Sequence, residues 1–401
     1  LIPLLFPDRT LPTIGDCYGD RPHLGRRADW EILCRRFRDP RYAWLLNDVP
    51  RRPPQAFFVG LAEMPESVPP GQYSRLWPEH GYAALRSTEG PEYWSGAGWS
   101  LFATYSSNRV HENHDKLSII LFADGHLWLP DCEAKPSAEH SFSADIQRQL
   151  NRQTVCHNTL LVDQRSQRHP GQPLELVEYQ ALPTMKRLTI ADGTGQLYAG
   201  VRQMRTCLVR DEYVLDFFQA DSDAPRDLDW LLHVDGESEG STADPTPEAI
   251  RFPDKVPWNY LRAPMRLGRA DTFWELFRHN QGRFRVDLAA SRTVEVLGCG
   301  FPRDDGTRPD VIPMRILRAG RQTEVWYAAV YRSGEELDEP VRCEVRPGHA
   351  GNWQVEIQLK GRRFIHRVPQ LGPSPRNKSV AFKHAIGAHR DHPRDGRWHE
   401  G

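Results

Sequence analysis

HENHDKLSIILFADGHLWLPD, which runs from His111 to Asp131, carries the clearest structural signal in the sequence. Two apolar runs flank Asp124-Gly125, and a two-residue turn of type I′ requires positive φ at both central positions, which Asp-Gly supplies readily. The segment therefore predicts a β-hairpin. A second motif, CHNTLLVD at 156–163, follows it. Histidines and carboxylates gather between these strand-like segments, which indicates a sheet that displays a polar site.

Composition limits the class of protein. The chain has 401 residues with 33 prolines and 30 glycines, so turns are frequent and long helices are few. This length and texture favour a β-rich body with more than one domain. Charged residues make up 26% and the net charge is -1, which argues against a nucleic-acid binder that works through a basic field. No apolar run approaches the roughly 20 residues that a membrane helix needs.

Several common motifs are absent from the sequence. Seven cysteines stand far apart without a CxxC pair, so neither a cysteine zinc site nor a disulfide framework is supported. The sequence also lacks a Gly-rich phosphate loop and a GxSxG nucleophile elbow. The chain begins at Leu1 without a methionine or a signal peptide, and we therefore expect it to be part of a longer protein.

The texture of the chain predicts four segments. We expect helices and a Pro-rich linker over 1–70, an antiparallel β-sandwich over 71–335 with the motif region at 111–167, remaining strands over 336–371, and a loose polar tail over 372–401. Asp39-Pro40 should divide the helical stretch at 26–46 into two helices. Strands are expected at 82–86, 99–105, 117–123, 126–129, 159–162, 203–209, 213–218, 230–234, 284–288, 293–297, 325–331 and 353–359.

The first candidate site lies at the start of the motif region. His111, Asn113 and Asp115 alternate, so on a strand their side chains would share one face, while His114 would point to the other. Histidine is the side chain best suited to proton transfer near neutral pH. The alternative is a polar edge strand or a loop without a catalytic role.

Asp131 and His157 are the candidate metal ligands. One histidine, one aspartate and a third N or O donor can form a zinc-type site when a water or a fourth ligand completes it. A two-residue turn would set Asp131 opposite Ser118, about 17 Å from Asn113 on a straight strand. A shared site therefore requires the segment around His111 to bend back over the sheet.

Two arginines and one further histidine have possible functional roles. Arg148 and Arg152 could face an anionic substrate, because guanidinium groups bind carboxylates in a bidentate manner. Solvated arginines are the more frequent alternative among 52 lysines and arginines. His233 sits in an apolar run, where a histidine with satisfied hydrogen bonds in the core is the usual case.

Together the motifs resemble the heparinase II/III family of polysaccharide lyases. The shared pattern comprises His111-x-x-x-Asp115-Lys-Leu-Ser118, the hairpin leading to Asp131, the stretch Arg152-x-Thr-x-x-His157-Asn-Thr159, and Gln167. Its Asp-Lys-Leu-Ser version is similar to the oligoalginate-lyase branch. The resemblance implies a mainly β fold: a large antiparallel β-sandwich preceded by the last helices of an α/α toroid. It also implies β-elimination on a uronic acid in the cleft between the two.

The resemblance assigns roles to individual residues. It implies that His111 reaches into the cleft as a charge neutraliser or proton-transfer group, and that Arg152 lies near the cleft. Asp131 and His157 match two ligands of a structural zinc, and Asn113 stands in the place of the third ligand, with His114 shifted beside it. An amide oxygen is a poorer zinc ligand than imidazole. The catalytic Tyr of the family, and its Asn or His, are expected in sequence upstream of Leu1.

Three functions compete at this point. The first is the C-terminal part of a lyase acting on an acidic polysaccharide, alginate or a glycosaminoglycan, with export to the periplasm or the outside of the cell implied by the resemblance. The second is a non-catalytic carbohydrate-binding or scaffold β-sandwich that lacks the catalytic residues of the toroid. The third is a metal-dependent hydrolase built on His114, Asp131 and His157. No nucleic acid or membrane partner is expected.

Overall fold

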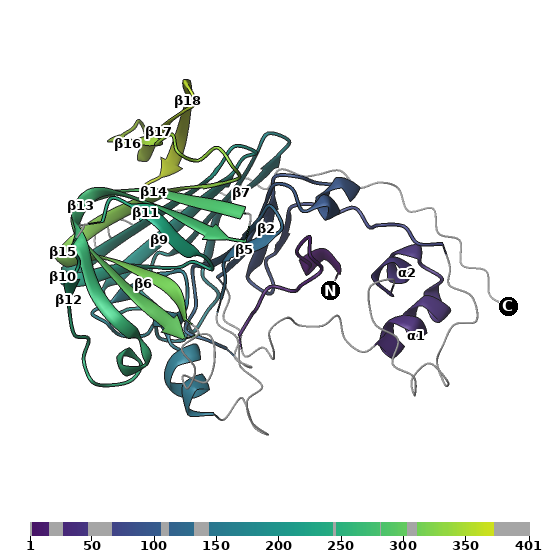
Figure 1. Cartoon of the computed structure of the whole chain (residues 1–401), viewed down its shortest axis with the longest axis horizontal. Helices are drawn as coiled ribbons and strands as arrows, with labels where there is room; N and C mark the ends of the chain where they lie inside the picture. The colour runs from purple at the N-terminus through teal and green to yellow at the C-terminus, as the bar shows by residue number, and fades with distance from the viewer. Residues whose placement is uncertain are drawn as a thin grey trace. The chain divides into compact units, whose positions relative to one another are not determined.

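The computed structural model describes residues 2–15, 27–46, 66–105, 112–131, 144–243, 246–280, 282–302 and 311–372. Leu1–Leu371 form one compact unit. Three antiparallel sheets dominate this unit (Figure 1). The expected mainly β, antiparallel fold is therefore confirmed. The predicted polar tail lies, apart from Gly372, outside the described residues.

Two helices occupy the predicted helical stretch. α1 (Arg27–Phe37) and α2 (Pro40–Leu46) are separated where Asp39-Pro40 predicts the break. Arg38 takes a positive φ of 51°, and the Asp39 carboxylate accepts a hydrogen bond from the Arg41 N–H at 2.9 Å, as an N-cap does. Proline suits the first helical position, because its missing N–H has no partner there anyway. Among the described residues, no helix is long and apolar enough to cross a membrane.

A five-stranded sheet contains the predicted hairpin. Its strands, in spatial order, are β1 (Arg75–Trp77), β2 (Tyr82–Arg86), β3 (Trp99–Thr104), β4 (Ser118–Ala123) and β5 (His126–Leu129). Asp124 and Gly125 have φ values of 48° and 81°, which confirms the predicted turn. The predicted register is wrong by one residue beyond it. Trp128 is an extra residue in β5, which forms a bulge there, so Leu129 pairs with Leu121 in place of Trp128. The Trp128 side chain is fully buried.

The largest sheet has ten strands. They are β6 (Leu160–Val162), β7 (Glu175–Leu182), β8 (Met185–Asp192), β9 (Val201–Val209), β10 (Val214–His233), β11 (Glu237–Ser241), β12 (Glu248–Ala249), β13 (Arg262–His279), β14 (Gly282–Pro302) and β15 (Val311–Ser333). The strands expected at 213–218 and 230–234 are one strand, β10, and those expected at 284–288 and 293–297 are both parts of β14. Bulges carry β10 through its polar middle, whose composition is that of a loop.

A single large core holds the two sheets together. Apolar side chains of β2–β5 and of β8–β10 and β13–β15 form one continuous buried cluster, which includes Trp128, Trp230 and Tyr331. Burial of this apolar area drives the packing of sheet on sheet that defines a sandwich. A smaller three-stranded sheet, β16 (Arg342–Pro347), β17 (Asn352–Leu359) and β18 (Arg362–Pro369), contributes Val355, Ile357 and Val368 to a second buried cluster shared with β10 and β15.

Candidate functional site

The segment that follows His111 is a turn and not a strand. His111 itself lies outside the described residues. Leu117 has a φ of 61°, and the Ser118 N–H donates to the Asp115 carbonyl at 3.1 Å. Of the two alternatives that the sequence leaves open, Asn113 and Asp115 therefore follow the loop and share no strand face, because the chain reverses before β4 begins.

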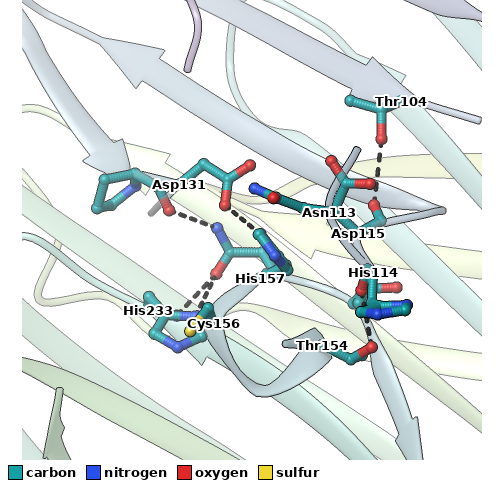
Figure 2. A network of polar contacts seen from close by, with 12 residues as sticks. Thr104, Asn113, His114, Asp115, Asp131, Thr154, Cys156, His157 and His233 are labelled. Atoms are coloured by element: carbon teal, nitrogen blue, oxygen red, sulfur yellow. Dashed lines mark hydrogen bonds and ion pairs between the residues drawn. The ribbon is translucent and has the colours of Figure 1, made fainter. Parts of the chain in front are cut away.

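Hydrogen bonds fasten this turn to the segment that carries the second motif. The His114 N–H donates to the Arg152 carbonyl at 3.0 Å, and the Thr154 hydroxyl donates to the His114 carbonyl at 2.7 Å (Figure 2). The Lys116 N–H donates to the Gln167 side chain at 2.8 Å, and that amide returns a bond to the Lys116 carbonyl at 2.9 Å. The motif residues thus meet through the bend that a straight strand would not provide.

Asp131 and His157 form a buried pair at the centre of the cluster. His157 Nδ1 hydrogen-bonds Asp131 Oδ1, and the two side chains are 0% and 2% exposed. Burial works against a charged imidazole, but the Asp131 carboxylate and its hydrogen bond prevail, so the pKa of His157 is raised. In Figure 2 the Asn113 amide points toward this pair. Arrangements of this kind hold an imidazole in one orientation and can keep it protonated.

Asn158 connects the cluster to β10. Its side-chain NH₂ donates to the Pro130 carbonyl at 2.9 Å and to the Ile119 carbonyl at 3.1 Å, so it ties β4 and the end of the hairpin together. Its side-chain oxygen accepts from the His233 N–H at 2.8 Å and lies 3.2 Å from His233 Nδ1. His233 therefore belongs to the cluster, which its apolar sequence context did not indicate.

Two histidines of the cluster are held neutral. Burial, aided by the nearby rings of His169 and His157, lowers the pKa of His114 to about 4. Burial and the proximity of His157 lower the pKa of His233 to about 3. The ring centroids of His114 and His169 are 4.2 Å apart. Among the described residues, nothing hydrogen-bonds the buried atoms His114 Nδ1, His157 Nε2, His233 Nε2 or Asn113 Oδ1. Such atoms mark a place where polar ligands can bind.

Because His233 is neutral in the folded protein, we expect the free energy of unfolding to decrease at acidic pH. A histidine in the unfolded chain binds a proton below about pH 6.5, whereas folded His233 does not. As pH is lowered, the unfolded state therefore gains a proton that the folded state does not, and the free energy of unfolding decreases. Between pH 6.5 and 4.5 we expect His233 to remove about 2 kcal/mol. His157 acts in the opposite direction, because its raised pKa adds stability on the acid side that is lost as pH rises through that pKa.

Urea denaturation at a series of pH values, on the His233→Gln variant, isolates the first of these contributions. Glutamine keeps an N–H donor for Asn158 but does not titrate, so the fall between pH 6.5 and 4.5 should be about 2 kcal/mol smaller than in the wild type. The exposed His349 gives the control, His349→Gln, which should keep the wild-type slope. Equal slopes in wild type and His233→Gln would contradict the assignment.

Lys116 places a buried positive charge in the turn. Its ammonium lies 2.6 Å from Asp115 Oδ1 and 3.0 Å from Glu112 Oε1, and all three side chains are at most 6% exposed. Burial alone would lower the pKa of Lys116, but the two carboxylates together raise it. Burial likewise opposes ionisation of Asp115, yet Lys116 and His157 lower the pKa of that carboxyl. Buried ion pairs between Lys116 and the two carboxylates thus stabilise the turn.

Arg205, which sequence analysis did not single out, supports the cluster from β9. It is fully buried and binds Asp216 through two bonds, of 2.8 and 2.5 Å. It also donates to the carbonyls of Leu117, at 2.6 Å, and Asn158, and so joins the turn to the second motif. An arginine in the middle of an apolar strand, with an aspartate on the next strand, is the signal that identifies it.

The two predicted anion-binding arginines differ in their surroundings. Arg148 is exposed and forms an ion pair with Asp145 at 2.8 Å. Arg152 is half-buried, and it contributes its backbone carbonyl to the turn through the bond from His114. Their role in substrate binding stays a prediction.

The residues present fit a structural zinc only in part. Asp131 and His157 are good ligands, but they bond each other, and the third place holds the Asn113 amide. In the described part of the chain, one group of three His, Cys, Asp or Glu side chains has metal-ligand spacing. It consists of His126, Asp235 and His279 and does not contain His114, Asp131 or His157. A metal at Asn113, Asp131 and His157 stays a prediction, and no chemical step is assigned to it.

Fold and site together define a large antiparallel β-sandwich protein with a buried histidine–carboxylate cluster. The chain belongs to the heparinase II/III-like family, since the C-terminal sequence profile of that family, "Heparinase II/III-like, C-terminal", matches residues 69–294. No curated protein sequence matches the chain.

Solved structures show the same fold. A heparinase III, the BT4657 gene product, superposes with a TM-score of 0.68 at 12% identity over 92% of this chain and 51% of its own. A second heparinase III gives 0.64 at 12% identity over 92% and 53%. The heparan sulfate lyase HepC from Pedobacter heparinus gives 0.59 at 15% identity over 92% and 51%. The chain thus spans about half the length of these structures.

Proposed function

We propose that this chain is the C-terminal part of a polysaccharide lyase that cleaves a uronic-acid polysaccharide by β-elimination. The observation that carries the proposal is the convergence of three motif segments, 112–118, 130–131 and 152–167, into one buried polar cluster directly after residue 111. Membership of the heparinase II/III-like family supports the same reaction class. Alginate is the first substrate to test, followed by heparan sulfate and hyaluronan, and export from the cytoplasm goes with this proposal.

The reaction requires charge to be handled at three points. A base removes the proton at C5, electrons move to form the C4–C5 double bond, and the C4–O bond breaks as an acid protonates the departing oxygen. Negative charge builds up beside the uronate carboxylate and needs donors or cations near it. We assign that role, or proton transfer, to His111. The base and the group that grips the carboxylate are expected upstream of Leu1.

The described residues serve this proposal by positioning. The side chains of Lys116, within the turn, and of Asp131, beside His157, are buried and do not reach a polymer in solvent. The ion pairs of Lys116 hold the turn that begins one residue after His111, and we expect this to limit where the imidazole can point. Positioning of a proton-transfer group to within a fraction of an ångström is worth large factors in rate.

The test is an assay of the complete protein on the three polysaccharides. Turnover creates an unsaturated uronate, whose ultraviolet absorbance reports the reaction directly. We expect His111→Ala to lower kcat/KM by about 100-fold or more, the usual effect of losing a proton-transfer group, with Tm unchanged. His349→Ala is the matched exposed control and should leave both values as they are. A complete protein inert on every acidic polysaccharide would contradict the proposal.

One observation favours a second candidate, a non-catalytic carbohydrate-binding module. Asn113, with its buried side-chain oxygen unbonded among the described residues, stands where the family resemblance places a histidine ligand. Saturable binding of an acidic polysaccharide by the complete protein, with no unsaturated product, would select this candidate over the lyase.

A further inference from the structure

Three side chains from distant parts of the chain meet at one corner of the sandwich. His126 is the first residue of β5, directly after the Asp124-Gly125 turn. Asp235 follows the end of β10, and His279 is the last residue of β13. His126 therefore comes from the five-stranded sheet, and the other two residues come from the ten-stranded sheet.

The spacing of their polar atoms is that of ligands around an ion. His126 Nε2 lies 3.6 Å from Asp235 Oδ2, and His279 Nδ1 lies 3.7 Å from Asp235 Oδ1. The three ligand atoms all lie within 4.8 Å of one another. Both N–O distances are too long for hydrogen bonds. A tetrahedral ion with bonds of about 2.0–2.2 Å separates neighbouring ligands by roughly 3.3–3.5 Å. Small side-chain movements would therefore bring the three ligand atoms to the separations that a bound ion requires.

The two imidazoles are stacked beside the carboxylate. Their centroids are 3.8 Å apart with an angle of 17° between the planes. His126 Nε2 also lies 2.8 Å from the Asp235 carbonyl oxygen. A neutral imidazole carries one N–H, so moving that proton to Nδ1 frees Nε2 for a metal with no change in charge. The Asp235 carbonyl then becomes a further oxygen donor at the same place.

The backbone around these residues is closely packed. Trp128 packs edge-on against the His126 ring at 4.6 Å and stacks on Phe284 at 5.1 Å. The Asp235 N–H donates to the Trp128 carbonyl at 2.9 Å, which fixes the turn after β10 against β5. Gly236 and Gly282 make this possible, because a Cβ on either would come within 3.3 Å of the indole. A preformed ligand set loses little entropy when an ion binds.

We propose that His126, Asp235 and His279 bind a divalent transition metal ion, best suited to Zn²⁺. Two imidazoles and a carboxylate are the donors that zinc selects, whereas Ca²⁺ and Mg²⁺ take oxygen ligands. The side chains are 18%, 17% and 35% exposed, so an ion can enter from solvent while the site remains partly shielded. The ion would link the two sheets of the sandwich. This site is separate from Asp131 and His157 and does not depend on the proposed lyase activity.

Zinc binding by the 401-residue protein, after chelator treatment and dialysis, tests the proposal. We measure bound Zn²⁺ by mass spectrometry and affinity by titration calorimetry for the wild type, His279→Ala and the exposed control His349→Ala. His279→Ala should lose one zinc equivalent, or bind it at least tenfold more weakly, while His349→Ala matches the wild type. A second zinc at Asp131 and His157 would add equally to all three proteins. Equal zinc content and affinity in the wild type and His279→Ala overturns the proposal.

Two further measurements on the wild type do not depend on the folding of a variant. Excess Zn²⁺ should raise Tm by about 2–5 °C, because an ion that binds only the folded state stabilises it by mass action. Anomalous diffraction at the zinc edge should place an ion between His126, Asp235 and His279. Zinc density confined to other positions overturns the proposal, even if the Tm rises.

Discussion

Arg205→Met should lower the free energy of unfolding by about 3–5 kcal/mol, the usual cost of removing one partner of a buried ion pair. Asp216 would lose both guanidinium bonds and keep the Tyr331 hydroxyl, at 3.0 Å, and the weaker Cys207 thiol, at 3.9 Å. The carbonyls of Leu117 and Asn158 would lose a donor at the same time. Urea denaturation at pH 7 measures the loss. Under the proposed function, activity should fall as well, because the turn and the second motif lose their common support.

Two variants separate the buried charge from simple loss of an arginine. Arg202 lies on the same strand and pairs with Asp221, whose side chain is 43% exposed. Arg202→Met should therefore cost no more than about 1 kcal/mol, as surface pairs do. Adding Asp216→Leu to Arg205→Met should recover much of the loss, since no uncompensated carboxylate then remains. Equal losses for Arg202→Met and Arg205→Met would show that the buried pair has no special weight.

Local rules predicted the parts of the fold that local chemistry controls. The Asp124-Gly125 hairpin and the helix break at Asp39-Pro40 both depend on conformations that two or three residues impose by themselves. β10 shows where such rules end. Its middle, at 221–227, is polar, and pairing with β9 and β15, with bulges in the ladder, keeps it extended. Pairing with strands that are distant in the sequence determines the extended conformation here, and the hydrophobic periodicity of β10 itself does not reveal that pairing.

The candidate site divides in the same way. The motif resemblance predicts Asp131 and His157 as metal ligands; the structure brings the two side chains together in one buried pair, and their role as ligands stays a prediction. Sequence analysis does not single out Arg205 and interprets His233 only as a core histidine, because the importance of both comes from long-range contacts, with Leu117 and with Asn158. Sequence alone leaves the segment after Glu112 open between a strand and a loop, because alternation of polar residues does not reveal that hydrogen bonds to the 152–167 segment reverse the chain.

Lys116→Met should destabilise the protein by about 3–5 kcal/mol at pH 7.5, because Asp115 and Glu112 would remain buried without their cation. The loss should depend on pH with a definite sign. In the wild type the pKa of Asp115 is lowered, so its contribution to stability is present above the pKa of the unfolded chain and lost as pH falls through the folded pKa. Without Lys116, burial dominates and raises that pKa.

The variant should therefore recover, relative to the wild type, as pH falls from 7.5 to 5, since protonation of Asp115 removes the uncompensated charge. Denaturation of both proteins across that range measures the difference. Lys186 provides the control, because its equally buried ammonium faces one carboxylate, Glu89, at 3.6 Å and donates to the Leu182 carbonyl. Lys186→Met should cost less and show no such recovery. A loss for Lys116→Met that stays constant between pH 7.5 and 5 would mean that packing of the lysine stem, and not its charge, holds the turn.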